Sequence, residues 1–106
     1  MNRESLKGHL DLLLLAVVGA GAAHGYLIAR RLAEASDGAL DLPEGTLYPA
    51  LHRLESKKLL SSSWATVAGR LRRVYDLTPA GEQALAQGRL DWGSFAKAVD
   101  SVLDTV

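Results

Sequence analysis

PEGTLYPALHRLESKKLL, residues 43–60, is the segment around which the rest of the chain is organised. Its apolar side chains recur at the spacing of an amphipathic helix and form one stripe, which consists of Leu47, Ala50, Leu51 and Leu54. We expect Thr46 to be the N-cap, because a threonine hydroxyl accepts a hydrogen bond from a free N–H group of the first turn. Pro49 then falls in that first turn, where its missing N–H leaves no bond unmade.

The opposite face of this helix is polar, cationic and aromatic, with Pro49, His52, Arg53 and Ser56 flanked by Thr46 and Tyr48. Such side chains suit a groove of DNA better than a protein core. Two strands are predicted to follow, residues 60–67 and 71–77, around a tip of Ala68-Gly69-Arg70. Residues 53–73 hold six Lys and Arg against one acid, although the whole chain has a net charge of +0. A core-docked helix followed by a basic hairpin is typical of a winged helix-turn-helix.

The chain resembles the PadR family of transcriptional regulators, of the short type with a single C-terminal helix. The matching motifs run in family order over nearly the whole chain: Leu6-Lys7-Gly8-His9-Leu10-Asp11, His24-Gly25-Tyr26, Gly45-Thr46-Leu47-Tyr48-Pro49-Ala50-Leu51 with Arg53-Leu54-Glu55, and Arg73, Tyr75 and Leu77-Thr78-Pro79-Ala80-Gly81. The resemblance implies a mainly α (α+β) fold, a winged helix-turn-helix with a two-stranded β wing and a C-terminal dimerisation helix. The chain departs from the family in its short wing without a polar tip, and in Val74, where an aromatic residue is common.

Composition restricts the remaining possibilities. The 106 residues have room for one modest core, and an apolar content of 48% leaves apolar surface for a partner subunit. There is no Cys, and no His and acid stand at ligand spacing, so we expect no metal site and a cytoplasmic location. Neither a catalytic triad, a carboxylate pair nor a phosphate loop is apparent, so we expect no cofactor and no catalytic residue.

The apolar N-terminus admits two interpretations. A secretory signal is one, but Glu4 and Asp11 interrupt it, and the uncharged run from 12 to 23 is shorter than the ~20 residues that span a bilayer. A buried helix over about residues 5–18 is the other, and we favour it; we therefore expect no contact with a membrane. A second helix over about 24–36 is predicted to bury Tyr26 and to leave Leu27 as an exposed apolar spot.

The C-terminal segment is predicted to be one long helix, with Thr78 as its N-cap and Pro79 in its first turn. Leu85, Trp92, Val99 and Val106 recur at a spacing of seven, which indicates a seam between helices. We therefore divide the chain into a DNA-binding domain, 1–77, and a C-terminal dimerisation helix, 78–106. The predicted homodimer contacts are Leu13, Leu14, Val17, Leu85, Trp92, Phe95, Val99 and Val102.

The candidate contacts to double-stranded DNA are Thr46, Tyr48, Pro49, His52, Arg53, Lys57, Arg70, Arg72 and Arg73. Several have plain structural alternatives. Arg53 and Lys57 can be solvated residues at a helix end, Tyr48 can pack against the second helix, and Arg73 can bridge the wing and the body. If all three wing arginines of both subunits contact phosphate, the log–log salt slope of binding is about −5.

Trp92 is the candidate outside the DNA-binding half. Some proteins that this chain resembles bind flat aromatic compounds at the dimer interface, with a Trp at this place. Gly88, one turn earlier, would leave room for such a small aromatic effector. The alternative is that Trp92 only anchors the dimer seam.

The sequence therefore predicts a dimeric repressor that binds a palindromic operator, with an aromatic effector as a further possibility. The competing hypothesis is a winged-helix module that binds a protein partner instead of DNA. The net charge of zero and the expected exposure of Leu27 are compatible with that hypothesis, whereas the local positive charge argues against it.

Overall fold

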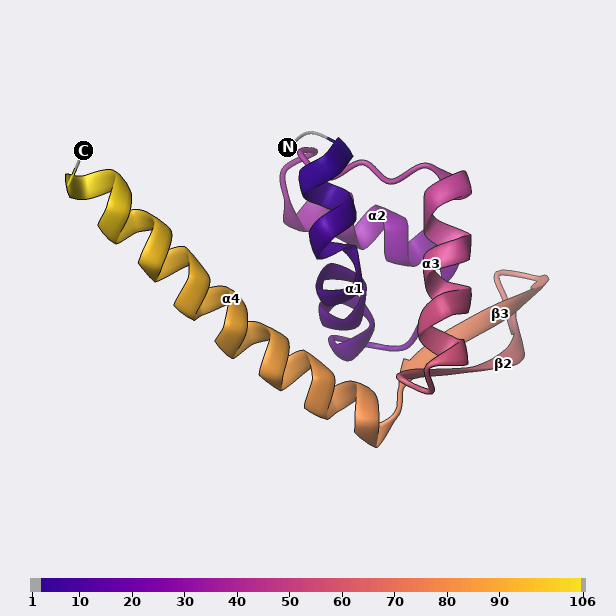
Figure 1. Cartoon of the computed structure of the whole chain (residues 1–106). Coiled ribbons are helices and arrows are strands. Elements are labelled where there is room, and N and C mark those ends of the chain that lie inside the picture. Colours follow the sequence, from indigo (N-terminus) through magenta and orange to yellow (C-terminus); the bar gives the residue numbers. More distant parts are fainter. Residues whose placement is uncertain (1–2, 106) are drawn as a thin grey trace.

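The computed structural model describes the backbone of residues 3–105 and the side chains of residues 9–105 (Figure 1). The motif residues Leu6, Lys7 and Gly8 and the seam residue Val106 lie outside the described side chains. The elements are α1 (Arg3–Gly19), β1 (Ala23–His24), α2 (Gly25–Ala35), α3 (Glu44–Ser56), β2 (Leu60–Val67), β3 (Arg70–Leu77) and α4 (Pro79–Thr105). The mainly helical winged-helix fold is as predicted.

The sheet has three antiparallel strands in the order β1-β3-β2. The wing is the β2–β3 hairpin, in register from Leu60 opposite Leu77 to Val67 opposite Arg70. Its turn is Ala68-Gly69, both at positive φ, as the favoured two-residue hairpin turn requires. Arg70 therefore begins β3 instead of forming the tip. The sequence did not predict β1, because two residues are too short for an alternating pattern.

The core lies where α1, α2 and α3 meet the base of the sheet. The predicted stripe of α3 is buried there: Leu47, Ala50, Leu51 and Leu54 are each at most 1% exposed. Leu14 of α1 is fully buried in the same core. Its assignment as a dimer contact was wrong, because a side chain enclosed by its own chain has no surface left for a partner.

The start of α3 differs from the prediction. The helix begins at Glu44 with Pro43 as N-cap, and the Pro43 carbonyl accepts the N–H groups of Thr46 and Leu47. Thr46 is thus the third helical residue and not the N-cap. The extended Pro43 presents its carbonyl to start the helix, and the Glu44 carboxylate favours the positive helix end. Pro49 then lies inside the helix and supplies no N–H for the Gly45 carbonyl.

Two expectations for α2 were also wrong. Tyr26 is 61% exposed instead of buried, and Leu27 is half-buried against the core instead of exposed. Ile28 and Leu32 provide the buried side. Gly25, Ile28 and Leu32 share one face at helical spacing, and Tyr26 lies off that face.

The start of α4 is capped as predicted. The Thr78 hydroxyl accepts the Gly81 N–H at 3.0 Å and donates to the Lys58 carbonyl at 2.7 Å. α4 packs along α1 and then projects away from the body (Figure 1). The Cα radius of gyration is accordingly 15.1 Å, against about 13 Å for a compact chain of this length.

Candidate nucleic-acid interface

The outward face of α3 is open to solvent along its length. Thr46, Pro49 and His52 are exposed, and Tyr48 is 43% exposed. The opposite stripe of the same helix is the centre of the core. α3 is therefore rigidly mounted, with short polar and aromatic side chains projecting from the molecule.

The two cations at the C-terminal end of α3 are held by one acid of α1. Arg53 Nη2 lies 2.5 Å from Asp11 Oδ1, and Lys57 Nζ lies 3.8 Å from Asp11 Oδ2. Asp11 was noted only as part of a motif, and sequence reasoning missed this role because the pair spans 42 residues. The ion pair orients both cations beside the outward face and offsets part of their charge.

Arg73 lies in a network between the wing and the body. Its Nε donates to Ser62 Oγ at 2.7 Å, and its Nη2 lies 3.6 Å from Glu55 Oε2 of α3. Its guanidinium also lies over the Trp64 ring, 5.4 Å from the ring centroid. This geometry favours the structural alternative for Arg73 over phosphate contact.

Arg70 and Arg72 are the remaining wing arginines. Neither forms an ion pair with a described residue. Successive side chains of a strand point to opposite faces, so Arg70 and Arg72 project from one face of β3 and Arg73 from the other. Both are therefore available for an anionic partner.

Tyr48 has one side in solvent and the other against the backbone of α2. A Cβ placed on Gly25 would lie 2.6–2.9 Å from three atoms of the Tyr48 ring and hydroxyl. Tyr75 lies nearby. Its pKa is raised, chiefly because the side chain is buried, so its phenol stays protonated. Tyr48 thus packs against α2, as the structural alternative expected, and still presents an exposed edge to solvent.

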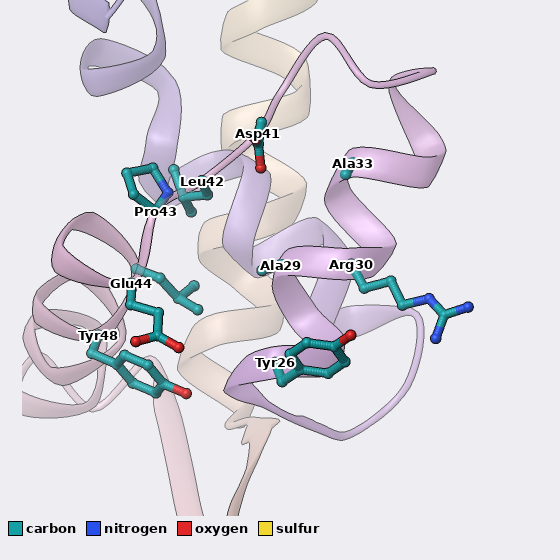
Figure 2. A pocket seen from close by; sticks show the side chains of 10 residues that line it. Tyr26, Ala29, Arg30, Ala33, Asp41, Leu42, Pro43, Glu44 and Tyr48 are labelled. Atoms are coloured by element: carbon teal, nitrogen blue, oxygen red, sulfur yellow. The ribbon is translucent and has the colours of Figure 1, made fainter.

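A hollow of about 370 Å³ lies between α2 and the start of α3. Figure 2 shows Tyr26 and Tyr48 on opposite sides of it, with Glu44 next to Tyr48 and Arg30 extending away. Asp41 lines it too, whereas Arg30 is paired with Glu34 at 2.9 Å. The two carboxylates make this hollow unfavourable for a phosphate, so a DNA backbone would pass elsewhere on the surface.

A second hollow, of about 200 Å³, lies on the wing side of Tyr48. It is lined by His24, Gly25, Tyr48, Trp64, Leu71, Arg72, Arg73 and Tyr75, and none of these is an acid. The pKa of His24 is lowered by partial burial and then by the nearby charges of Arg72 and Arg31. The sequence placed His24 only at the start of a helix. It could not place His24 near Arg72, because that proximity depends on the pairing of β1 with β3, which was not predicted.

The predicted seam lies on α4. Trp92, Phe95, Val99 and Val102 are between 36% and 62% exposed. Trp92 meets the His9 ring of α1 edge-on, with centroids 4.9 Å apart. A Cβ on Gly88 would lie 2.7 Å from a methyl carbon of Leu12, so Gly88 leaves no room for a ligand and was wrongly assigned to an effector site.

Comparisons with known proteins place these features in context. The sequence profile described as "Transcriptional regulator PadR-like family" matches residues 14–87. The chain is similar to the transcriptional regulator Rv3488 of Mycobacterium tuberculosis, with 38% identity over 92% of this chain and 88% of the relative.

Solved structures give the same result. A PadR family regulator from Eggerthella lenta superposes with a TM-score of 0.84 at 30% identity, covering 97% of this chain and 88% of the other. One from Clostridium difficile gives 0.80 at 31% identity, covering 91% and 99%. Among residues 3–105, no helix is both long and apolar enough to span a membrane.

Proposed function

Because the chain belongs to the PadR-like family of transcriptional regulators, we propose that it acts as a homodimeric repressor on a palindromic operator. The observation that carries this proposal is the arrangement of α3. One face of this helix is the centre of the core, and the other is exposed. The wing cations Arg70 and Arg72 form no ion pair with a described residue, and Arg72 lines the same hollow as Tyr48 of α3. The two α3 helices of a dimer would enter successive major grooves about 34 Å apart.

The interface divides into two kinds of contact. Arg70 and Arg72 would bind backbone phosphates and set the register, whereas Thr46, Tyr48, Pro49 and His52 would face the bases. Arg73 is removed from the phosphate set because it is held by Ser62 and Glu55. Four phosphate contacts in a dimer give a log–log salt slope of about −3.6 instead of about −5.

The dimer would form through α4. Residues 1–77 would be the DNA-binding head, and residues 78–106 would join two heads. The exposed apolar side chains along the projecting part of α4, Trp92, Phe95, Val99 and Val102, support this division. Fully burying a Val or Phe side chain contributes roughly 1.5–3 kcal/mol, so burial of these partly exposed positions of α4 would favour association.

A small flat aromatic compound would act as effector at this seam, beside Trp92. The cluster of Trp92 with His9 and Phe95 supports such a site, since the Trp92 ring centroid lies 4.9 Å from that of His9 and 6.2 Å from that of Phe95. Binding there would change the spacing of the two heads and shift the population that fits DNA. If Trp92→Ala leaves both dimerisation and ligand-dependent fluorescence quenching unchanged, this effector site is excluded.

A binding experiment tests the DNA proposal. Fluorescence anisotropy is measured with duplex fragments of the protein's own upstream region and with scrambled fragments of equal composition. We expect one upstream fragment to bind at least tenfold more tightly than its scrambled partner, and His52→Ala to reduce this preference. Equal, weak binding to every fragment would favour the alternative, a winged-helix module that docks a protein.

A further inference from the structure

The hollow of about 200 Å³ on the wing side of Tyr48 is lined by a histidine, His24, that is not among the proposed DNA contacts. His24 and Arg72 lie on the same face of the sheet, because His24 is opposite Val74 and Arg72 is two residues along β3. Both line the hollow, and no acid does. Arg31 lies nearby, fixed by a 2.9 Å hydrogen bond from its Nη1 to the Gly21 carbonyl.

We propose that this hollow binds one DNA backbone phosphate between His24 and Arg72, and that His24 takes up a proton when it does so. The inference rests on the proposed function, since it names a contact within the same DNA interface and its dependence on pH. It adds His24 and a proton to the two proposed phosphate contacts, Arg70 and Arg72, whose charges are permanent.

The position of the hollow supports a phosphate of DNA as its occupant. It shares Tyr48 with the outward face of α3 and Arg72 with the wing, so it lies between the two parts that would contact one duplex. A backbone that leaves the groove contacted by α3 passes the hollow on its way to the wing. The acidic hollow on the other side of Tyr48, with Asp41 and Glu44, offers no such position.

The electrostatic surroundings of His24 determine the direction of the pH effect. Arg72 from β3 and Arg31 and the stacked Tyr26 from α2 lie near His24. The same hollow is also lined by Arg73 and Tyr75 from β3, Tyr48 from α3 and Trp64 from β2. Burial and the two arginines lower the His24 pKa, so the imidazole is neutral at pH 7 in the free protein. A phosphate beside it would favour the imidazolium and raise this pKa.

DNA binding and proton uptake by His24 are linked. Between the pKa of the free protein and the higher pKa of the complex, the complex binds one more proton per head than the free protein does. Affinity for DNA therefore rises as the pH falls through this window, by at most about tenfold per pH unit for each head. Above the pKa of the complex, His24 is neutral both with and without DNA, so the affinity no longer depends on pH through this residue.

The test measures DNA affinity by fluorescence anisotropy from pH 6.0 to 8.5 at constant ionic strength, using the intact protein. We expect the wild type to bind more tightly as the pH falls and His24→Asn to lose most of this dependence. Asn is a good N-cap, so it suits the start of α2. His24→Lys, charged throughout this range, is expected to bind tightly with little pH dependence.

Two controls make the result specific. His52→Asn removes the other histidine of the candidate interface and is expected to keep the pH dependence, whatever its affinity at pH 8.5. Inorganic phosphate, at matched ionic strength, is expected not to displace DNA; competition by free phosphate would assign the hollow to a small anion instead.

Other outcomes would overturn the proposal. Tight binding by the wild type with no pH dependence would reject the His24 site and leave the proposed function intact, whereas failure to bind any duplex would reject both. The pKa of His24 is also measured by NMR in the wild type with and without DNA, which needs no variant. An unchanged pKa would reject the proton uptake.

Discussion

The ring of Tyr48 occupies the space that a side chain at position 25 would need. A Cβ on Gly25 would lie 2.6 Å from one ring carbon and 2.8 Å from the hydroxyl oxygen of Tyr48. The glycine at the start of α2 and the tyrosine on the outward face of α3 therefore form one unit. This contact explains physically why His-Gly-Tyr and Gly-Thr-Leu-Tyr-Pro occur together in this chain.

Gly25→Ala is expected to displace the Tyr48 ring outward, because its other side is free to move. We expect a loss of about 1 kcal/mol in the free energy of unfolding, together with weaker DNA binding, measured by denaturant titration and anisotropy. Tyr48→Ser provides the matched background, in which Gly25→Ala is expected to cost little. The same cost in both backgrounds would mean that the contact does not constrain position 25.

Gly81→Ala is expected to be more damaging, since its Cβ would lie 2.0 Å from the Leu59 carbonyl oxygen. A backbone atom cannot move aside as a side chain does, so we expect a loss of about 3 kcal/mol or more. Gly93→Ala is the control in the same helix: nothing lies within 4 Å, and alanine there should stabilise by about 0.5–1 kcal/mol. If both variants unfold at the wild-type denaturant concentration, the close packing of α4 on Leu59 is wrong.

Asp11→Ala is expected to strengthen DNA binding, because it releases Arg53 and Lys57 from their shared acid. We expect an increase of about fivefold in affinity and a loss of less than about 1 kcal/mol in stability, since the pair is partly exposed. Glu34→Ala removes an acid that pairs with Arg30 on α2 and should leave affinity unchanged. Weaker binding by Asp11→Ala would instead mean that the acid positions the two cations productively.

Val99→Glu is expected to dissociate the proposed homodimer, because it buries a charge in the seam. Sedimentation velocity should show a mainly monomeric variant at concentrations where the wild type is dimeric. Ser101→Glu adds the same charge on the opposite side of α4 and should remain dimeric. If both variants remain dimeric, the C-terminal half of α4 is not part of the dimer interface.

Elements with strong local signals were predictable from the sequence. The apolar stripe of α3, the wing strands and the Thr78 cap all follow from periodicity or from one side chain and its neighbours. The start of α3 did not follow, because extended Pro43 competes with Thr46 for the same role. β1 was missed since its two residues form a strand only where β3 provides a partner.

The candidate site was less predictable than the fold. The exposed face of α3 followed from helical geometry, but the availability of each cation depends on contacts between distant segments. Asp11 reaches Arg53 across 42 residues, and Arg73 is held by Ser62 and Glu55. Periodicity also could not tell that Leu12 fills the space beside Gly88, since packing between α1 and α4 decides it.

The salt dependence of binding measures how many phosphates of the DNA backbone this surface contacts. Affinity for the tightest upstream fragment is measured at several salt concentrations for the wild type, for Arg72→Gln and for Arg73→Gln. We expect a log–log slope of about −3.6 for the wild type and about −1.8 for Arg72→Gln, which loses one phosphate contact in each subunit. Arg73→Gln should keep the wild-type slope and lose stability. A wild-type slope near zero would contradict the proposal that this surface binds the DNA backbone.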